Sequence, residues 1–227
     1  MPRETMDREI RELQDDILAL GSMVEKNIVD AMISLKKRDT KLSRVVLAAD
    51  QKVNKKRFDI ESSTLLVIAT QQPMAHDLRL LAAILEVAGE LERIGDYAKG
   101  NAKINILLKD TLLHVPILEL EAMSEIVVSM LHKAVIGFIK EDERSAREIP
   151  EEDDQVDEMY KNIYHKLVDM MIKAPEEIDH ANYYMWAAHN LERTADRVSN
   201  ICERTIFVVT GELLEVATQD TNPEDVS

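Results

Sequence analysis

Residues 90–96 read ELERIGD and residues 190–196 read NLERTAD, so the pattern Leu-Glu-Arg-x-x-Asp occurs twice, 100 positions apart. In each copy the Glu precedes the Asp by four residues, which places both carboxylates on one face of a helix, about 5–6 Å apart. Like charges at this spacing destabilise a helix by a few tenths of a kcal/mol. A chain that repeats such a pair either neutralises the two negative charges or uses them in a function.

The hydrophobic pattern before the first motif predicts three long helices. A second helix is expected to begin at Asp39 or Thr40, which can cap it, and to end before QQP at 71–73. We expect Pro73 to open a third helix, which carries the motif and runs toward Leu108. In the first helix, apolar residues recur at gaps of three or four, as expected of one buried face: Ile10, Leu13, Ile17, Leu20, Val24, Ile28, Ala31 and Leu35.

The same arrangement restarts in the second half of the chain. Pro116 is expected to begin a fourth helix. The charged stretch 141–160 leads into a fifth helix, which Pro150 either starts or kinks. Pro175 then opens a sixth helix, which carries the second motif and ends near Gly211.

The matching order of elements indicates an internal duplication. Besides the two motifs, DQKVN at 50–54 in the second helix corresponds to DDQVD at 153–157 in the fifth. Three helices followed by three helices, with short connections, favour antiparallel bundles. We therefore predict an all-α fold of two tandem antiparallel three-helix bundles over residues 1–112 and 113–212, followed by a disordered acidic tail over 213–227.

The net charge of −15 narrows the classes of partner. Nucleic acid and anionic membrane surfaces repel such a chain, whereas cations, metal ions and basic protein surfaces attract it. Cys202 is the single cysteine, which excludes an intrachain disulfide and predicts a buried thiol in a reducing compartment. The N-terminus lacks an apolar signal segment, and no apolar run approaches the roughly 18 residues that span a bilayer. We therefore expect a cytoplasmic protein without membrane insertion.

Small residues surround the first motif. Gly89, Gly95 and Gly100 are half of the glycines in the chain, and all three lie within the predicted third helix. Each costs about 1 kcal/mol relative to Ala in a helix interior. We expect these residues, which lack large side chains, to let another backbone approach closely. Sequences usually depart from helix propensity in this way at functional or close-packed sites.

Two helices in each half carry an acid or an amide at positions i and i+4, so their oxygen atoms converge if these faces adjoin. The residues are Asp50, Asn54, Glu92 and Asp96 in the first half, and Asp153, Asp157, Glu192, Asp196, Asn200 and Glu203 in the second. Hard oxygen ligands suit Mg, Ca, Mn or Fe, and Zn less exclusively. Two simpler interpretations stay open: the charges are solvated, or Arg93 and Arg193 neutralise them across a helix interface. From residue types alone, arginine pairing and metal binding are equally good explanations.

Four stretches of the chain resemble the PhoU family, the accessory regulators of high-affinity phosphate transport in bacteria and archaea. The resemblance extends over about residues 4–211. It implies a cytoplasmic, usually dimeric, all-helical protein without enzymatic activity, which represses the phosphate-starvation response when phosphate is plentiful. It also implies two partners, the ATPase subunit of the phosphate ABC transporter and a phosphate-sensing histidine kinase. The four stretches are ELERIGDYAKGNAK at 90–103, NLERTADRVSNICE at 190–203, QQPMAHDLR at 71–79 and DDQVDEMY at 153–160.

The resemblance further implies metal binding on the acidic motifs, since some family members hold multinuclear iron or zinc clusters there. Iron or zinc is therefore the expected metal, with Mg, Mn or Ca as further options. Carried over by position, the first site comprises Glu92, Asp96, Asp50 and Asn54, and the second comprises Glu192, Asp196, Asn200, Asp153 and Asp157. Three arginines at or beside characteristic family positions are expected to make structural or partner contacts: Arg79, Arg93 and Arg193.

The first site departs from the family pattern at two positions. Gly100 stands where the pattern, and the corresponding Asn200 of this chain, has an amide. Lys103 stands where the second copy has Glu203. These changes remove a ligand or add positive charge, so the first site is the less well supported of the two.

Two other functions remain as alternatives. A carboxylate-bridged di-iron enzyme requires two Glu-x-x-His motifs on facing helices, and this chain has one, Glu177 to His180, at a helix start where acids are common. A purely structural helical scaffold would use the repeated motif for packing alone. Trp186 is expected in the core or in a dimer contact. We interpret the chain as a regulatory adaptor whose acidic faces bind metal ions.

Overall fold

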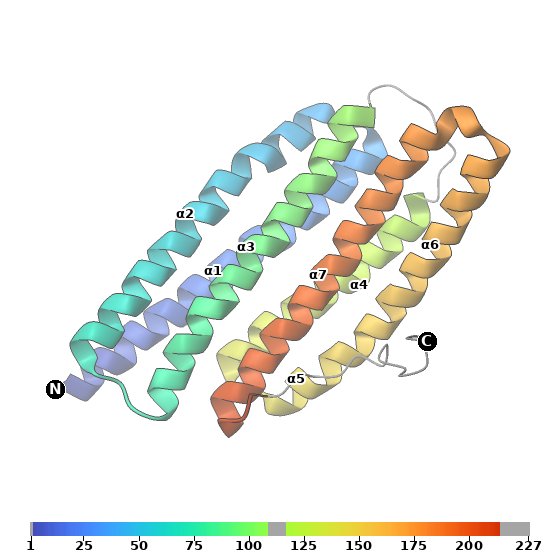
Figure 1. Cartoon of the computed structure of the whole chain (residues 1–227). Helices are drawn as coiled ribbons and strands as arrows, with labels where there is room; N and C mark the ends of the chain where they lie inside the picture. Colours follow the sequence, from blue (N-terminus) through green and yellow to red (C-terminus); the bar gives the residue numbers. More distant parts are fainter. Residues whose placement is uncertain (1, 109–116, 214–227) are drawn as a thin grey trace.

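Two bundles of long antiparallel helices lie side by side in the computed structural model, which describes residues 2–108 and 117–213 (Figure 1). The first bundle consists of α1 (Pro2–Lys37), α2 (Thr40–Gln71) and α3 (His76–Leu108). The second consists of α4 (Ile117–Lys140), the short α5 (Glu143–Glu148), α6 (Asp153–Lys173) and α7 (Ile178–Thr210). Short 3₁₀ helices, η1 (Ile149–Glu152) and η2 (Pro175–Glu177), lead into α6 and α7. No strand occurs in the described ranges, and the predicted fold class is confirmed.

The predicted apolar seam of the first helix is the core-facing side of α1. Its residues, from position 10 to position 35, are at most 8% exposed. Burying a side chain of the size of Val, Leu or Ile stabilises the fold by about 1.5–3 kcal/mol. The helix ends at Lys37, and the next residue, Arg38, adopts a left-handed backbone conformation with φ 54. Asp39 then caps α2 as predicted, because its carboxylate accepts hydrogen bonds from the backbone N–H groups of Lys41 and Leu42.

The prediction that Pro73 opens the third helix is wrong. Helix α3 begins at His76, three residues later. The cause is the backbone between the helices, where Gln72 and Ala75 both adopt left-handed angles (φ 49 and φ 48) and reverse the chain direction. Pro73 therefore lies inside the reversal rather than in the first helical turn.

Two of the remaining predicted helix starts, Pro150 and Pro175, lie within the described residues. Pro150 and Pro175 lie in η1 and η2, the 3₁₀ turns before α6 and α7, where a missing N–H breaks no helical hydrogen bond. Pro116, the predicted division at 112–113 and nearly all of the predicted tail lie outside the described residues.

The two bundles share one hydrophobic core. Helix α3 packs along α7 and α1 packs along α4 (Figure 1). A continuous cluster of buried apolar side chains includes residues from all six long helices. The duplicated halves are therefore joined along a common interface, which we call the α3–α7 seam after its central pair of helices.

Polar contacts fix the register of the α3–α7 seam. Near one end, Arg204 Nη1 lies 2.9 Å from Glu86 Oε2. Near the other, Asn190 Nδ2 donates a hydrogen bond to Asn101 Oδ1 at 2.8 Å. Residues early in α3 thus contact residues late in α7, and residues late in α3 contact residues early in α7, so the two helices run antiparallel.

Side chains of neighbouring helices, rather than another backbone, lie close to two of the three glycines of α3. A Cβ on Gly100 would lie 2.9 Å from Asn190 Nδ2, and one on Gly95 would lie 3.2 Å from Val53 Cγ1. Nothing lies within 4 Å of the corresponding position at Gly89. Helices α7 and α2 therefore press on different faces of α3 through these two positions.

Helix α4 corrects the expectation that no segment is long and apolar enough to span a bilayer. Residues Glu119–Lys140 meet that description, with a mean hydropathy of 1.5. Half of this apolar window is buried inside the protein, where α4 packs against α1 and α7. A helix buried between neighbours becomes apolar on several faces, which accounts for the composition.

Two further burial predictions have different outcomes. Cys202 is fully buried, as predicted, and burial raises the pKa of its thiol to about 12. Trp186 is 54% exposed on α7, so it is not a core residue. Its role in a contact with a second copy stays a prediction.

Arg79 on α3 holds the last turn of α7. Its Nε and Nη2 groups donate hydrogen bonds to the carbonyl oxygen of Val208, at 3.1 and 3.0 Å. Gly211 ends the helix with φ 81, a conformation that glycine adopts without strain, and its N–H donates to the carbonyl of Phe207. A side chain of the first half thus satisfies a backbone group at the end of the second.

Substituting Arg79→Ala should lower the free energy of unfolding by about 1.5–3 kcal/mol, because two charge-assisted hydrogen bonds across the seam are lost. Arg93→Ala, at an exposed position of the same helix, is the matched control and should change it by about 0.5 kcal/mol or less. Urea denaturation followed by circular dichroism measures both values. Equal effects of the two substitutions would contradict the bridging role of Arg79.

Candidate metal sites

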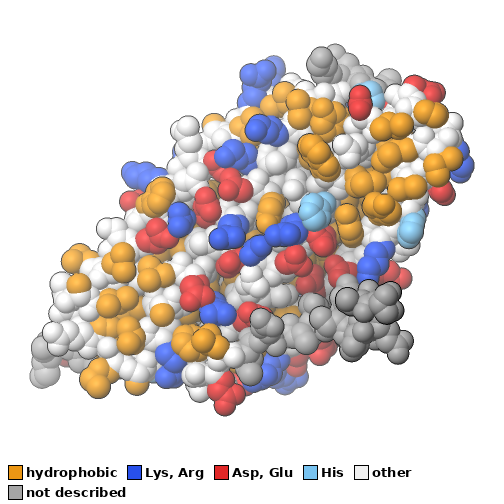
Figure 2. Space-filling model, in the orientation of Figure 1, with side chains coloured by type: hydrophobic (Ala, Val, Ile, Leu, Met, Phe, Trp, Pro, Cys, Tyr) orange, Lys and Arg blue, Asp and Glu red, His pale blue; other side chains and the backbone are white. Residues whose placement is uncertain are grey.

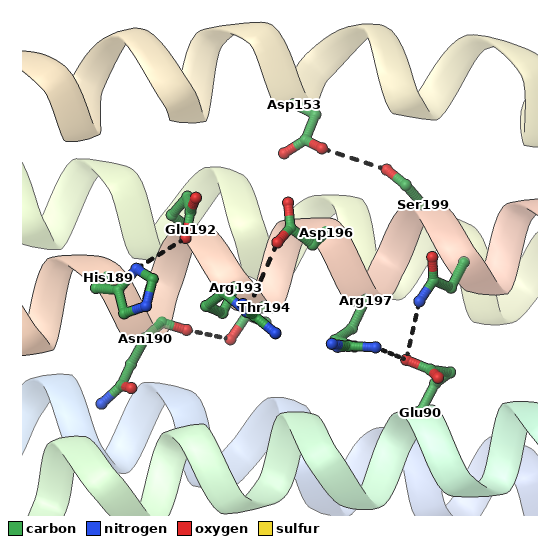
Figure 3. Close-up of polar contacts among 11 residues, drawn as sticks. Glu90, Asp153, His189, Asn190, Glu192, Arg193, Thr194, Asp196, Arg197 and Ser199 are labelled. Atoms are coloured by element: carbon green, nitrogen blue, oxygen red, sulfur yellow. Dashed lines mark hydrogen bonds and ion pairs between the residues drawn. The ribbon is translucent and has the colours of Figure 1, made fainter. Parts of the chain in front are cut away.

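The second acidic cluster lies between α6 and α7 and consists of Asp153, Asp157, Glu192 and Asp196. Asp153 points from α6 toward α7, while Glu192 and Asp196 project from α7 toward α6 (Figure 3). The facing acidic stripes expected from the sequence are therefore present in this half.

Asp153 is the most deeply placed member of the second acidic cluster. It is 3% exposed, and its Oδ2 accepts a hydrogen bond from Ser199 Oγ at 3.4 Å. Its Oδ1 is also buried and accepts no hydrogen bond from any described residue. Leaving a buried charged acceptor unsatisfied costs more than the roughly 1–3 kcal/mol typical of a neutral group. A cation beside this oxygen would relieve that cost.

Burial, together with neighbouring carboxylates, raises pKa values in the second acidic cluster. Burial raises the pKa of Asp153 to about 7, with Asp157 and Asp196 adding to the effect. Burial likewise raises the pKa of Glu192 to about 7, and Asp196 and Asp157 again add to it. The pKa of Asp196 is raised by burial, against the opposing influence of Arg193 and other cationic groups. Near neutral pH this cluster therefore retains protons unless a positive charge replaces them.

Asn200 is not brought together with the second acidic cluster. Its Nδ2 donates to Glu90 Oε2 on α3 at 3.3 Å, on the other side of α7. With 3.6 residues per turn, each four-residue step advances around the helix axis by about 40°. Two such steps after Glu192, the stripe has rotated by about 80°, from α6 toward α3. The Asn200 amide therefore points toward α3 instead of extending the stripe that faces α6, and its role as a metal ligand stays a prediction.

The first acidic cluster lies between α2 and α3 and consists of Asp50, Asn54, Glu92 and Asp96. Asp50 is 5% exposed, and Asn54 Nδ2 donates to its Oδ2 at 3.4 Å. Burial raises the pKa of Glu92, with Asp96 adding to the effect and Arg57 of α2 opposing it. The predicted residues of the first half thus adjoin as those of the second half do.

Lys99 belongs to the first acidic cluster, and the sequence analysis did not identify it. Its Nζ lies 2.7 Å from Asp50 Oδ2 and 3.4 Å from Asp96 Oδ1. The hydrogen bond to Asp50 is the largest cause of the raised pKa of Lys99. The one signal in the sequence was its place three residues after Asp96, which is on the same face of the helix.

The two motif arginines have different surroundings in the part of the chain that the structure describes. Arg193 Nε lies 3.8 Å from Asp196 Oδ2 within α7 itself. Arg93 is exposed on α3. A different arginine crosses the α3–α7 seam: Arg197 Nη1 lies 3.4 Å from Glu90 Oε2 (Figure 3).

Two histidines have defined places. His189 Nδ1 lies 3.1 Å from Glu192 Oε2, beside the second acidic cluster, a contact that the sequence analysis missed although the two residues are three positions apart (Figure 3). His180 Nδ1 contacts Glu177 Oε2 at 2.9 Å, so the single Glu-x-x-His motif closes on itself at the start of α7. This arrangement does not favour the di-iron alternative.

The second acidic cluster fits a cation by its chemistry. It offers hard carboxylate oxygens from two helices, a buried oxygen on Asp153 that accepts no hydrogen bond from the described residues, and carboxyl pKa values raised by burial and by neighbouring carboxylates. Within residues 2–108 and 117–213, no three His, Cys, Asp or Glu side chains converge closely enough to hold an ion as they stand. Side-chain rotation would have to complete the ligand set, and Asp196, whose side chain is 46% exposed, has room to rotate.

Both halves of the chain match a model of a known protein family, described as the PhoU domain, over residues 17–104 and 120–205. The phosphate-specific transport system accessory protein PhoU homolog of Clostridium acetobutylicum is 31% identical over 217 residues, which cover 95% of this chain and 99% of that protein. The accessory protein PhoU of Escherichia coli K12 is 32% identical over 205 residues, which cover 90% and 85%.

Solved structures give the same result. The phosphate transport system regulatory protein PhoU from Streptococcus pneumoniae matches with a TM-score of 0.86 and 30% identity, over 92% of this chain and 99% of that one. PhoU from Pseudomonas aeruginosa matches with a TM-score of 0.87 and 31% identity, over 91% and 99%.

Metal-free protein should lose stability as the pH rises from about 4 to about 7. Asp153 and Glu192 have ordinary pKa values of 3.8 and 4.5 and folded values of about 7. In this window the folded state binds more protons than the unfolded chain, so the free energy of unfolding falls with rising pH. Urea denaturation in the presence of a chelator, repeated across this range, measures the slope.

The variant Asp153→Asn is the control for this pH dependence. Its amide stays neutral at every pH, so the slope should be shallower and the metal-free protein should be more stable than the parent above about pH 7. A slope that the substitution leaves unchanged would show that Asp153 carries no repulsive charge in the folded protein.

Proposed function

The chain belongs to the PhoU family, and from that premise we propose that it is an accessory regulator of phosphate uptake. The observation that carries this proposal is the match of both halves to the PhoU domain, together with relatives named as phosphate-specific transport accessory proteins over nearly their whole length. Two solved PhoU structures share the fold, with TM-scores of 0.86 and 0.87 over 99% of their own length.

The proposed mode of action is that of a cytoplasmic, non-enzymatic adaptor. It binds the ATPase subunit of a phosphate ABC transporter and a phosphate-sensing histidine kinase, and it represses the phosphate-starvation response when phosphate is plentiful. A homodimer is part of this proposal. All three contacts require exposed surface that suits protein partners.

Exposed apolar side chains support a role in binding other proteins. Figure 2 shows charged side chains of both signs along the middle of one face and apolar side chains toward its two opposite ends. Isolated exposed apolar residues are ordinary, whereas apolar areas with polar surroundings are typical of protein contacts. Exposed apolar residues include Leu65, Leu66 and Met74 near the α2–α3 turn with Phe58 further back on α2, and Ile172 and Ile178 near the α6–α7 turn with Trp186 further along α7.

The second acidic cluster is the proposed metal site, with Asp153, Asp157, Glu192 and Asp196 as ligands. A bound cation would supply the positive charge that these four carboxylates lack. Iron or zinc is proposed from the family resemblance, and the oxygen donors suit Mg, Mn or Ca as well. The raised carboxyl pKa values and the orphaned oxygen of Asp153 support this assignment.

Affinity purification of the full chain tests the regulatory proposal. Cells grown in phosphate-rich and phosphate-starved media are compared, and bound proteins are identified by mass spectrometry. We expect recovery of the transport ATPase or the sensor kinase, in amounts that differ between the two media. Recovery of neither protein in either medium would count against an adaptor of this class.

Metal analysis tests the proposed site. The double substitution Glu192→Ala/Asp196→Ala should abolish the metal content of the purified protein, because it removes both α7 ligands. The control Asp154→Ala/Glu158→Ala removes the same charge from exposed positions of α6 and should retain the metal. Elemental analysis of both variants gives the answer, and unchanged metal in the first variant would refute the site.

A further inference from the structure

Position 99 distinguishes the two acidic clusters. The offset of 100 that relates the two motifs places Lys99 in correspondence with Ser199. In the second half, Ser199 Oγ donates to Asp153 Oδ2 at 3.4 Å. In the first half, Lys99 Nζ donates to Asp50 Oδ2 at 2.7 Å. The same place beside a buried aspartate therefore holds a neutral hydroxyl in one half and an ammonium group in the other.

Lys99 connects both helices that form the first acidic cluster. Its ammonium group contacts Asp50 on α2 and, at 3.4 Å, Asp96 on α3. Asp50 is 5% exposed, and its second oxygen, Oδ1, is buried and accepts no hydrogen bond from the described residues. Nζ therefore lies between carboxylates of two helices, where a bridging metal ion would have to lie.

An ammonium group and a metal ion compete for the same carboxylate oxygens. The lysine has three N–H donors and a full positive charge, so it neutralises carboxylates without needing a bound ion. A divalent ion requires these oxygens as direct ligands at roughly 2.0–2.6 Å, which the bound ammonium prevents. The ion would also add its charge beside that of Lys99.

We propose that Lys99 is a built-in cation that excludes metal from the first acidic cluster, so that the chain binds metal in the second cluster alone. This inference rests on the proposed metal function of the second cluster. The two halves then differ in the source of positive charge, which is covalently attached in one and taken from solution in the other.

Two neighbouring features agree with this assignment. Position 100 supplies no side-chain ligand because it is a glycine, and a Cβ there would lie 2.9 Å from Asn190 Nδ2 of α7. An ordinary surface ion pair would join two exposed groups, whereas Lys99 reaches a buried carboxylate.

Lys103 is the other basic residue of this half that departs from the family pattern. It is exposed on α3 and provides a control.

Titration with Mn²⁺ tests the inference in a full-length chain whose second cluster is disabled by Glu192→Ala/Asp196→Ala. Isothermal titration calorimetry, with electron paramagnetic resonance to count free Mn²⁺, should detect no bound ion in this background. Adding Lys99→Ser, which reproduces Ser199, should create an Mn²⁺ site. Adding Lys103→Ser instead should not. Asp50→Asn on top of Lys99→Ser should weaken the new site roughly tenfold or more, about 1.4 kcal/mol.

Circular dichroism confirms that each variant is folded, and Lys99→Gln replaces Lys99→Ser if that variant unfolds. A folded Lys99 variant that gains no Mn²⁺ would overturn the inference. The inference would also be overturned if the chain with the disabled second cluster bound Mn²⁺ and Asp50→Asn abolished that binding. The first cluster would then bind metal with Lys99 present. The proposed metal site of the second cluster is judged separately: it fails if the unmodified chain binds no Mn²⁺ that depends on Glu192 and Asp196.

Discussion

Burial of carboxylates between packed helices is the constraint on which the rest of this structure depends. Each half places an acidic pair of its third long helix against a second acidic or amide pair on a neighbouring helix, and one aspartate in each set is almost completely buried. The hydrophobic core fixes the helices that bring these groups together, so the repulsion cannot be relieved by moving the backbone. Positive charge must come from a side chain, from bound protons or from an ion in solution.

The two halves satisfy this constraint differently. In the first, Lys99 reaches across from α3 to Asp50 on α2. In the second, Ser199 is the one hydrogen-bond donor to Asp153 among the described residues, and burial raises the pKa of Asp153 to about 7. Duplication thus preserved the positions of the acids while the neighbouring residue diverged. A site equivalent by descent need not be equivalent in chemistry.

The fold could be predicted from the sequence because helix periodicity is a local property. The seam of α1 and the cap at Asp39 follow from spacing and residue type alone. Errors arose where geometry is not local. The start of α3 depends on the left-handed angles around Pro73, and Asn200 turns away because the helical period drifts over two steps. The contact of Lys99 with Asp50 depends on how two helices are rotated against each other, which spacing within one helix does not specify.

The polar contacts on the α3–α7 seam have one more consequence. Asn200 contacts Glu90, and Asn190 approaches Gly100. These two contacts are equivalent under the offset of 100 between the halves, because Asn200 corresponds to Gly100 and Glu90 corresponds to Asn190. The seam therefore has an approximate twofold axis. A homodimer of one three-helix bundle, paired through the same surface, would have this symmetry, whereas two bundles in one chain can change independently. The unequal residues Gly100 and Asn200 are an asymmetry that such a homodimer cannot carry.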